Sequence, residues 1–181
     1  MVERKAALPS LRDLYLRHPG LYEPLCRAYA DAAAICLAEN YVPPVEIEIL
    51  YNNSSGFRDL SWEIPAENAK ASWNNKDDAT EQGAYSVSLA VVEAELGLVA
   101  LSRAETRTGA DYYIGIPGTD LEESYRLEVS GTRSSEMREV QSRLRQKLEQ
   151  ARKGQSNKPA LACIVGFGTK TIAIADLEYD A

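Results

Sequence analysis

Acidic residues occupy unusual positions in two short segments, Asp111–Ile116 and Tyr125–Val129. Both segments are rich in β-branched and aromatic residues, as strands are, and the polar residues Pro117–Asp120 between them are typical of a connecting loop. Asp111 opens the first segment, and Glu128 lies inside the second. Asp is depleted in strands, and a carboxylate is costly to bury unless something pairs with it. Because two carboxylates on adjacent strands can bind one hard cation, the pair indicates a candidate metal site.

Each of these features also has a purely structural interpretation. Asp111 follows a glycine and can be a turn residue that hydrogen-bonds its own backbone. Glu128 can point to solvent from an edge strand. Glu81, near the start of an expected helix, is favoured there by the helix dipole alone. The segment Ser130–Thr132 can simply end a strand. A single active site would explain the three acids together, so both interpretations stay open at this point.

Composition narrows the class of protein. A chain of 181 residues with a net charge of −7 suits one domain with a small N-terminal extension, and it argues against broad binding to nucleic-acid backbones. The three cysteines lack the spacing of a zinc site or a disulfide framework. His18 is the only histidine and precedes a proline, so nothing supports a nucleophilic site built on it. No segment has the length of a membrane span or a signal peptide, and we expect a cytoplasmic protein.

The first 78 residues predict helices followed by a hairpin. Residues Tyr22–Ala38 repeat apolar side chains at helical spacing, and Pro43 and Pro44 end that helix. Residues Val45–Tyr51 alternate at the period of a strand. We expect Asn52–Gly56 to turn the chain and Leu60–Ile64 to form the partner strand.

The next segment predicts a long helix and a strand. After a polar connection at Lys70–Asp78, either Asp78 or Thr80 can cap a helix from Ala79 to about Leu96. Gly97 suits the end of that helix. Residues Leu98–Ala104 then form the first core strand.

The C-terminal part continues as helix, strand, strand. Residues Ser134–Lys153 form a charged amphipathic helix, and its apolar side carries Val140, Leu144 and Leu148. The apolar segment Pro159–Phe167 predicts a buried strand, and a turn leads into a last strand at Thr171–Leu177. The basic side chains of the helix suit a solvated face. The order of elements predicts an α/β fold with a mixed central sheet flanked by helices.

With that order, residues 79–177 resemble the PD-(D/E)XK nuclease superfamily, particularly the archaeal Holliday-junction-resolvase type. The matching residues are ATEQGAYSVSLAVVEAELGLVALSRAETRTGADYYIG, followed by YRLEVSG. The resemblance implies a restriction-endonuclease-like core at residues 79–181 and leaves residues 1–78 unexplained. The pattern of residues 1–78 itself predicts a small α/β extension, helical with a hairpin. The resemblance also implies metal-dependent hydrolysis of DNA.

The resemblance assigns roles to individual residues. Glu81 would be the acid on the first helix, Asp111 the central metal ligand and Glu128 the second ligand. The peptide carbonyl of Val129 would lie near the metal. The implied cofactor is Mg²⁺ or Mn²⁺, which would position a water and neutralise charge on the scissile phosphate.

One position departs from the superfamily. Its motif ends in Lys, where this chain has Ser130, and a hydroxyl cannot supply positive charge to the developing transition state. A relocated cation would have to replace it. Lys147 on the following helix is our choice, with Arg126 and Arg133 as alternatives.

Two functions follow from this departure. The first is a Mg²⁺-dependent deoxyribonuclease in which Lys147 supplies the missing charge. The second is a catalytically inactive nuclease fold that binds another protein, which the acidic composition suits. The expected partners are therefore DNA, a second copy of the chain or another protein, and not a membrane.

Overall fold

The computed structural model describes residues 6–106, 108–154 and 156–177, and it is built on one mixed sheet of seven strands. The strands lie side by side in the order β2-β1-β7-β6-β5-β4-β3. The strands are β1 (Val45–Tyr51), β2 (Ser54–Leu60), β3 (Val99–Arg103), β4 (Tyr112–Gly115), β5 (Tyr125–Thr132), β6 (Ala160–Gly166) and β7 (Thr171–Asp176). The helices are α1 (Glu23–Ala38), α2 (Glu67–Ser72), α3 (Lys76–Leu96) and α4 (Met137–Lys153), with 3₁₀ turns η1 (Leu11–Leu16) and η2 (Leu121–Glu123). The expected α/β class with a mixed, helix-flanked sheet is confirmed.

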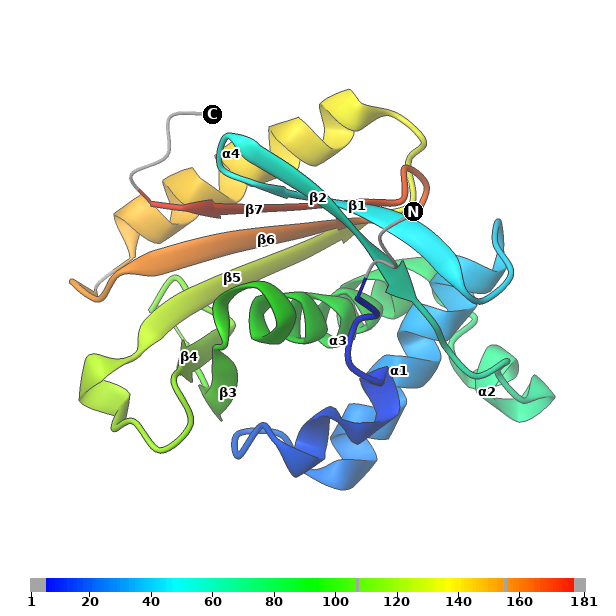
Figure 1. Ribbon diagram of the computed structural model, residues 1–181, viewed down its shortest axis with the longest axis horizontal. Helices are drawn as coiled ribbons and strands as arrows, with labels where there is room; N and C mark the ends of the chain where they lie inside the picture. Colours follow the sequence, from blue (N-terminus) through cyan, green and yellow to red (C-terminus); the bar gives the residue numbers. More distant parts are fainter. Residues whose placement is uncertain (1–5, 107, 155, 178–181) are drawn as a thin grey trace.

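Helices cover the two faces of the sheet unequally. Helix α4 lies on one face, and α1 and α3 lie on the other (Figure 1). Strand β6 is buried on both faces because helices cover each of them. Its successive side chains point in opposite directions, so they alternate between the two covered faces. Cys163 belongs to the core under α1 and α3, whereas Ala162 and Ile164 pack under α4. This explains why residues 160–166 form an uninterrupted apolar segment.

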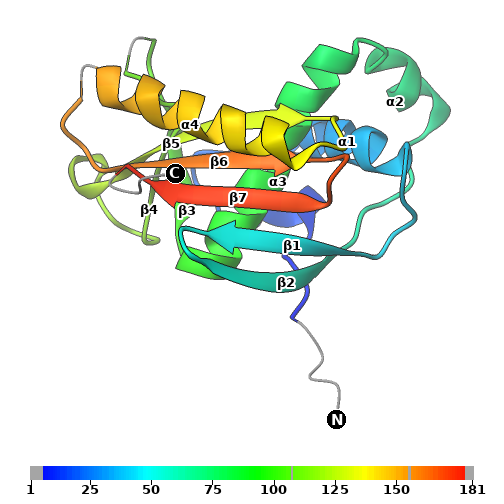
Figure 2. The same ribbon diagram turned by 90° about the horizontal axis from the view of Figure 1, so that it is seen from above.

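The N-terminal hairpin belongs to the same sheet as the rest of the chain. Strand β1 pairs in parallel with β7, and β2 continues the sheet outward as an edge strand (Figure 2). Helix α1 packs along α3, and Gly83 of α3 lies against the backbone of Ala33. The described residues before and after position 78 therefore share one sheet and one apolar core.

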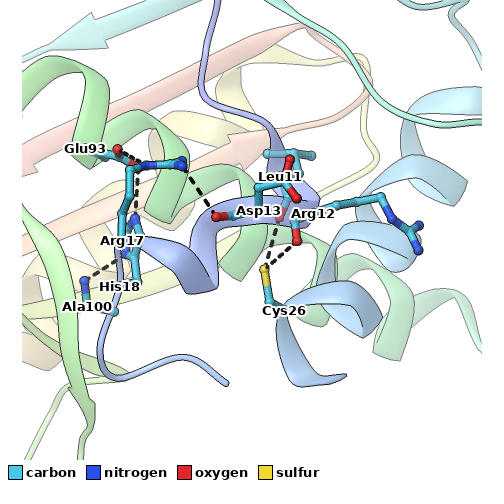
Figure 3. A network of polar contacts seen from close by, with 8 residues as sticks. All are labelled: Leu11, Arg12, Asp13, Arg17, His18, Cys26, Glu93 and Ala100. Atoms are coloured by element: carbon cyan, nitrogen blue, oxygen red, sulfur yellow. Dashed lines mark hydrogen bonds and ion pairs between the residues drawn. The ribbon is translucent and has the colours of Figure 1, made fainter. Parts of the chain in front are cut away.

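The segment after η1 covers the opposite edge of the sheet, at β3. Its contacts centre on His18, which is fully buried (Figure 3). The backbone N–H of Ala100 donates to Nδ1 of His18 at 2.9 Å, and Nε2 of His18 lies 3.0 Å from Oε2 of Glu93. The N–H of Gly20 donates to the carbonyl of Ala100 at 2.9 Å. Because Nδ1 accepts a hydrogen bond, Nε2 carries the proton, and the imidazole serves as a strand partner for β3.

The predicted partner strand of the hairpin is wrong. Strand β2 begins at Ser54, and its register places Leu60 opposite Val45, so residues 61–64 lie beyond the pairing. The turn is shorter than expected because Asn52 adopts a positive φ of 49°, which a tight two-residue hairpin turn requires. An edge strand needs few apolar residues, so the mostly polar sequence SSGFRDL does not show the pattern of a strand.

The start of the long helix also differs from the prediction. Asn75 caps α3, because its side chain accepts hydrogen bonds from the N–H groups of Asp77 (3.0 Å) and Asp78 (3.4 Å). The helix therefore begins at Lys76 rather than Ala79, and part of the expected polar connection forms α2. Its end is as predicted, since Gly97 takes the left-handed conformation at φ 66°. Within the described ranges, no helix combines the length and apolar character needed to cross a membrane.

Candidate active site

A pocket of about 540 Å³ opens beside the C-terminal half of β5. One wall is the first turns of α3, and the opposite wall is α4. The pocket is lined by Asp77, Thr80, Glu81 and Tyr85 of α3, by Asp111, by residues 129–133, and by Arg143 and Lys147 of α4. The walls differ in charge: the α3 side is acidic and the α4 side is basic.

The pocket exists because β4 is short. Strand β4 pairs with β5 only at residues 125–127, so the later residues of β5 have no neighbouring strand on that side. Even-numbered residues of β5 bond toward β6, as the contacts of Arg126 N–H with Pro159 and of Thr132 C=O with Phe167 illustrate. Successive peptide groups of a strand alternate in direction, so the backbone of Val129 and Gly131 faces the open side.

Asp111 lies where β4 begins, and its side chain continues the pairing. Its backbone N–H donates to the carbonyl of Leu127 at 2.8 Å, and its Oδ2 accepts the N–H of Val129 at 2.8 Å. The carboxylate thus bonds to the neighbouring strand and not to its own backbone, so the turn interpretation of this residue is wrong.

Glu81 approaches Asp111 through a shared partner. The hydroxyl of Tyr85 lies 2.9 Å from Oδ1 of Asp111 and 3.4 Å from Oε1 of Glu81. Glu81 is exposed at the mouth of the pocket, whereas Tyr85 is buried behind it. The two acids are distant in sequence, yet they lie within hydrogen-bonding range of one hydroxyl.

Glu128 is buried and paired. Its side chain is only 3% exposed, and its Oε2 accepts a hydrogen bond from Nζ of Lys147 at 2.7 Å. Burial raises the pKa of Glu128, the ammonium of Lys147 opposes that shift, and the nearby charge of Asp111 adds to it. The interpretation of Glu128 as a solvent-facing residue on an edge strand is therefore wrong.

The pairing of β5 with α4 follows a regular register. Ser130 lies two residues after Glu128 on the strand, and its Oγ lies 3.4 Å from Nη1 of Arg143, one turn before Lys147 on the helix. Two residues span about 6.6 Å of strand and four residues about 6 Å of helix, so successive pairs stay aligned. Ser130 is inside β5 rather than in a turn that ends it.

The other two cations considered for the missing Lys have different partners. Arg126 is buried and donates to the carbonyls of Thr108, Ala151 and Lys158, so it ties two loops to the last turn of α4. Arg133 lines the pocket and pairs with Glu39. Of these candidates, Lys147 is the one in contact with a predicted acid.

Besides Arg133, five of the sequence-predicted residues line the pocket: Glu81, Asp111, Val129, Ser130 and Lys147. Glu128 lies directly behind Lys147. Across the residues that the structure describes, no group of three or more His, Cys, Asp or Glu side chains is arranged to hold a metal ion. A cation at this pocket would thus depend on a small number of carboxylates together with backbone oxygen and water.

Three further residues at this site, Tyr85, Arg103 and Arg143, carry no sequence motif that marks them as functional. Arg103 donates to the hydroxyl of Tyr85 at 2.9 Å, and its Nη2 lies 3.6 Å from Oδ1 of Asp111. Tyr85 follows Glu81 by four residues, and Arg143 precedes Lys147 by four. Residues at that spacing share a helix face, so Tyr85 and Arg143 could have been predicted from the helical positions of Glu81 and Lys147.

Comparisons of this chain with protein-family models, with curated proteins and with solved structures found no match.

Proposed function

We propose that this protein hydrolyses phosphodiester bonds in DNA with the help of a divalent cation. The observation that carries the proposal is the meeting of four side chains from four separate parts of the chain. Glu81, Asp111 and Lys147 line one open pocket, and Glu128 supports it from behind. Acidic groups that could hold a cation and a basic group that could stabilise an oxyanion thus lie together.

The oxygen atoms at the acidic side suit Mg²⁺ or Mn²⁺, which prefer carboxylate and carbonyl ligands. Asp111 would hold the ion, together with the carbonyl of Val129 on the unpaired side of β5. Glu128 would be the second ligand if its carboxylate turned from Lys147 toward the pocket. A bound divalent cation would polarise the phosphate and lower the pKa of a water molecule. Glu81, exposed at the mouth, would orient a water that enters from solvent.

Lys147 supplies the positive charge that Ser130 lacks. Its ammonium group donates to Glu128, and its side chain is 22% exposed, so it faces both the buried acid and the pocket. A cation beside the scissile phosphate would stabilise the negative charge that develops during hydrolysis. Ser130 then serves as a partner of Arg143.

Cleavage of single-stranded, duplex and branched DNA in Mg²⁺ or Mn²⁺ tests this proposal. We expect Lys147→Met to lower the rate about 10²–10³-fold, since that is the usual cost of losing transition-state charge stabilisation. Lys147→Arg, which keeps a cation, should retain more activity. Lys153→Met is the matched control, because Lys153 lies on the same helix and is 74% exposed.

Assays are run below the melting temperature of each variant, so that a loss of rate reports chemistry and not unfolding. Ser130→Lys should leave cleavage unchanged or increase it. If pure wild-type protein cuts none of the three substrates and Ser130→Lys restores no cutting, the nuclease proposal is wrong.

A second candidate is a non-catalytic fold that binds another protein. The observation that favours it is that both acids already have protein partners: Glu128 has Lys147, and Asp111 has Val129 and Tyr85. The net charge of −7 also suits a protein partner better than DNA. Absence of cleavage, combined with saturable binding to one purified basic protein, would favour this candidate.

A further inference from the structure

The hydroxyl of Tyr85 joins the acidic side of the pocket to a cluster of aromatic rings. It lies within hydrogen-bonding distance of Oδ1 of Asp111 (2.9 Å), Oε1 of Glu81 (3.4 Å) and Nη2 of Arg103 (2.9 Å). Tyr85 is 2% exposed, so these three side chains, and not bulk water, satisfy its hydroxyl.

The chemistry of these groups fixes the direction of each hydrogen bond. A guanidinium can only donate, so the hydroxyl of Tyr85 accepts from Arg103 and gives its single proton to a carboxylate. Asp111 is the closer acceptor. The phenol carries one proton, and of these three partners only the two carboxylates can accept it.

Asp111 is therefore held at both oxygens. Tyr85 donates to Oδ1, and the backbone N–H of Val129 donates to Oδ2. Two donors from different elements, α3 and β5, fix the rotation of the carboxylate about its Cβ–Cγ bond. A ligand group held in this way loses little conformational freedom when it binds a metal ion.

The ring of Tyr85 is itself immobilised. It packs against Tyr29 and Tyr112 at centroid distances of 5.3 and 5.7 Å. The guanidinium of Arg103 lies 4.3 Å from the centroid of Tyr85 and 4.8 Å from that of Tyr112. Aromatic and cation–π contacts of this kind hold a ring in one orientation.

We propose that Tyr85 is a positioning residue, whose hydroxyl orients the Asp111 carboxylate for a divalent cation. This inference rests on the proposed function, because it assumes that Asp111 binds a cation. It assigns Arg103 a different effect: its positive charge, 3.6 Å from Oδ1 of Asp111, opposes cation binding while its stacking supports the ring.

Titration of the apo protein with Mn²⁺ by calorimetry tests the inference. Partners of metal ligands typically contribute 10–100-fold to metal affinity, so Tyr85→Phe should weaken Mn²⁺ binding by about that factor. Tyr113→Phe is the matched control, because it removes a hydroxyl from β4 that bonds Glu105 at 3.0 Å. Its affinity for Mn²⁺ should equal that of the wild type. In cleavage assays, Tyr85→Phe should raise the Mg²⁺ concentration for half-maximal rate and leave the rate at saturating Mg²⁺ nearly unchanged.

A second variant separates the hydroxyl from the packing around it. Arg103→Met leaves the Tyr85–Asp111 hydrogen bond and removes the positive charge, so it should bind Mn²⁺ at least as tightly as the wild type. If Arg103→Met weakens binding as much as Tyr85→Phe does, packing and not the hydroxyl orients Asp111, and the inference is overturned. Wild-type affinity in Tyr85→Phe overturns it as well. A wild-type protein that binds no Mn²⁺ overturns the metal-dependent function, and this inference falls with it.

Discussion

Nζ of Lys147 lies 2.7 Å from Oε2 of Glu128, although the two residues are 19 positions apart in the chain. The strand carries the acid into the core, and the following helix returns antiparallel over it, which brings the ammonium group back to the same level. Burial of the acid makes this pair a structural element as well as a candidate catalytic one, so its removal affects both stability and activity.

The contribution of this ion pair to the free energy of unfolding is tested by a double-mutant cycle in urea. Lys147→Met should lower the free energy of unfolding by about 3 kcal/mol, the low end for breaking a buried pair, because Lys147 is partly exposed. Adding Glu128→Gln should recover most of that loss, since the buried charge is then gone. Lys153→Met should cost at most about 0.5 kcal/mol. Additive effects of the two substitutions would show that the ion pair does not couple them.

Divalent cations should stabilise the folded protein. An ion bound only by the native state adds about 2.7 kcal/mol at a concentration of 100 Kd, which corresponds to roughly 5–10 °C in melting temperature. Asp111→Asn should abolish this gain, as measured by thermal melts with and without Mg²⁺ or Mn²⁺. Asp120→Asn removes the same charge from an exposed loop residue and should keep the gain. A wild-type melting temperature that neither metal changes would contradict a cation site at Asp111.

Stability should fall with acidification because of His18. Burial lowers the pKa of His18 from its ordinary value of 6.5; Glu93 opposes the shift, and Arg17 adds to it. The unfolded state therefore binds a proton more readily than the folded state. The contribution of neutral His18 to the free energy of unfolding is complete above about pH 6.5 and is lost as the pH falls below it. The loss approaches about 1.4 kcal/mol per pH unit.

Two measurements check this pH dependence. His18 is the only histidine, so a single imidazole resonance reports its titration in the folded protein by NMR. Urea unfolding between pH 5.5 and 8 gives the slope in stability, and His18→Gln should flatten it. An imidazole that titrates at or above 6.5 in the folded state would disprove the predicted direction.

Gly83 should resist substitution, because α1 and α3 approach each other closely at this position. A Cβ added to Gly83 would lie 2.7 Å from the backbone nitrogen of Ala33. Ala is favoured over Gly in a helix by about 1 kcal/mol, but overpacking against rigid backbone should outweigh this. We expect Gly83→Ala to lower the free energy of unfolding by about 1–3 kcal/mol. Gly56→Ala is the control, since no atom lies within 4 Å of its added Cβ. Equal stabilities of the two variants would mean that the helices can separate at no cost.

The sequence alone determined the elements whose pattern is local. Helix α4, with Val140, Leu144 and Leu148 on its buried side, follows from the helical period. The end of α3 at Gly97 follows from the left-handed conformation that glycine adopts freely. The two acids Asp111 and Glu128 were recognisable because strands of this composition rarely contain unpaired carboxylates. These features depend on neighbouring residues, so they are readable without knowledge of the fold.

What those residues contact depends on the tertiary structure. Strand β2 was mislocated because its pairing with β1, and not its composition, makes it a strand. The hydrogen bonds of Tyr85 with Asp111 and of His18 with Ala100 join residues that are 26 and 82 positions apart. Such contacts are fixed by strand order, register and the packing of helices on each face. No local period contains that information, because each contact depends on where two distant segments lie in the same sheet.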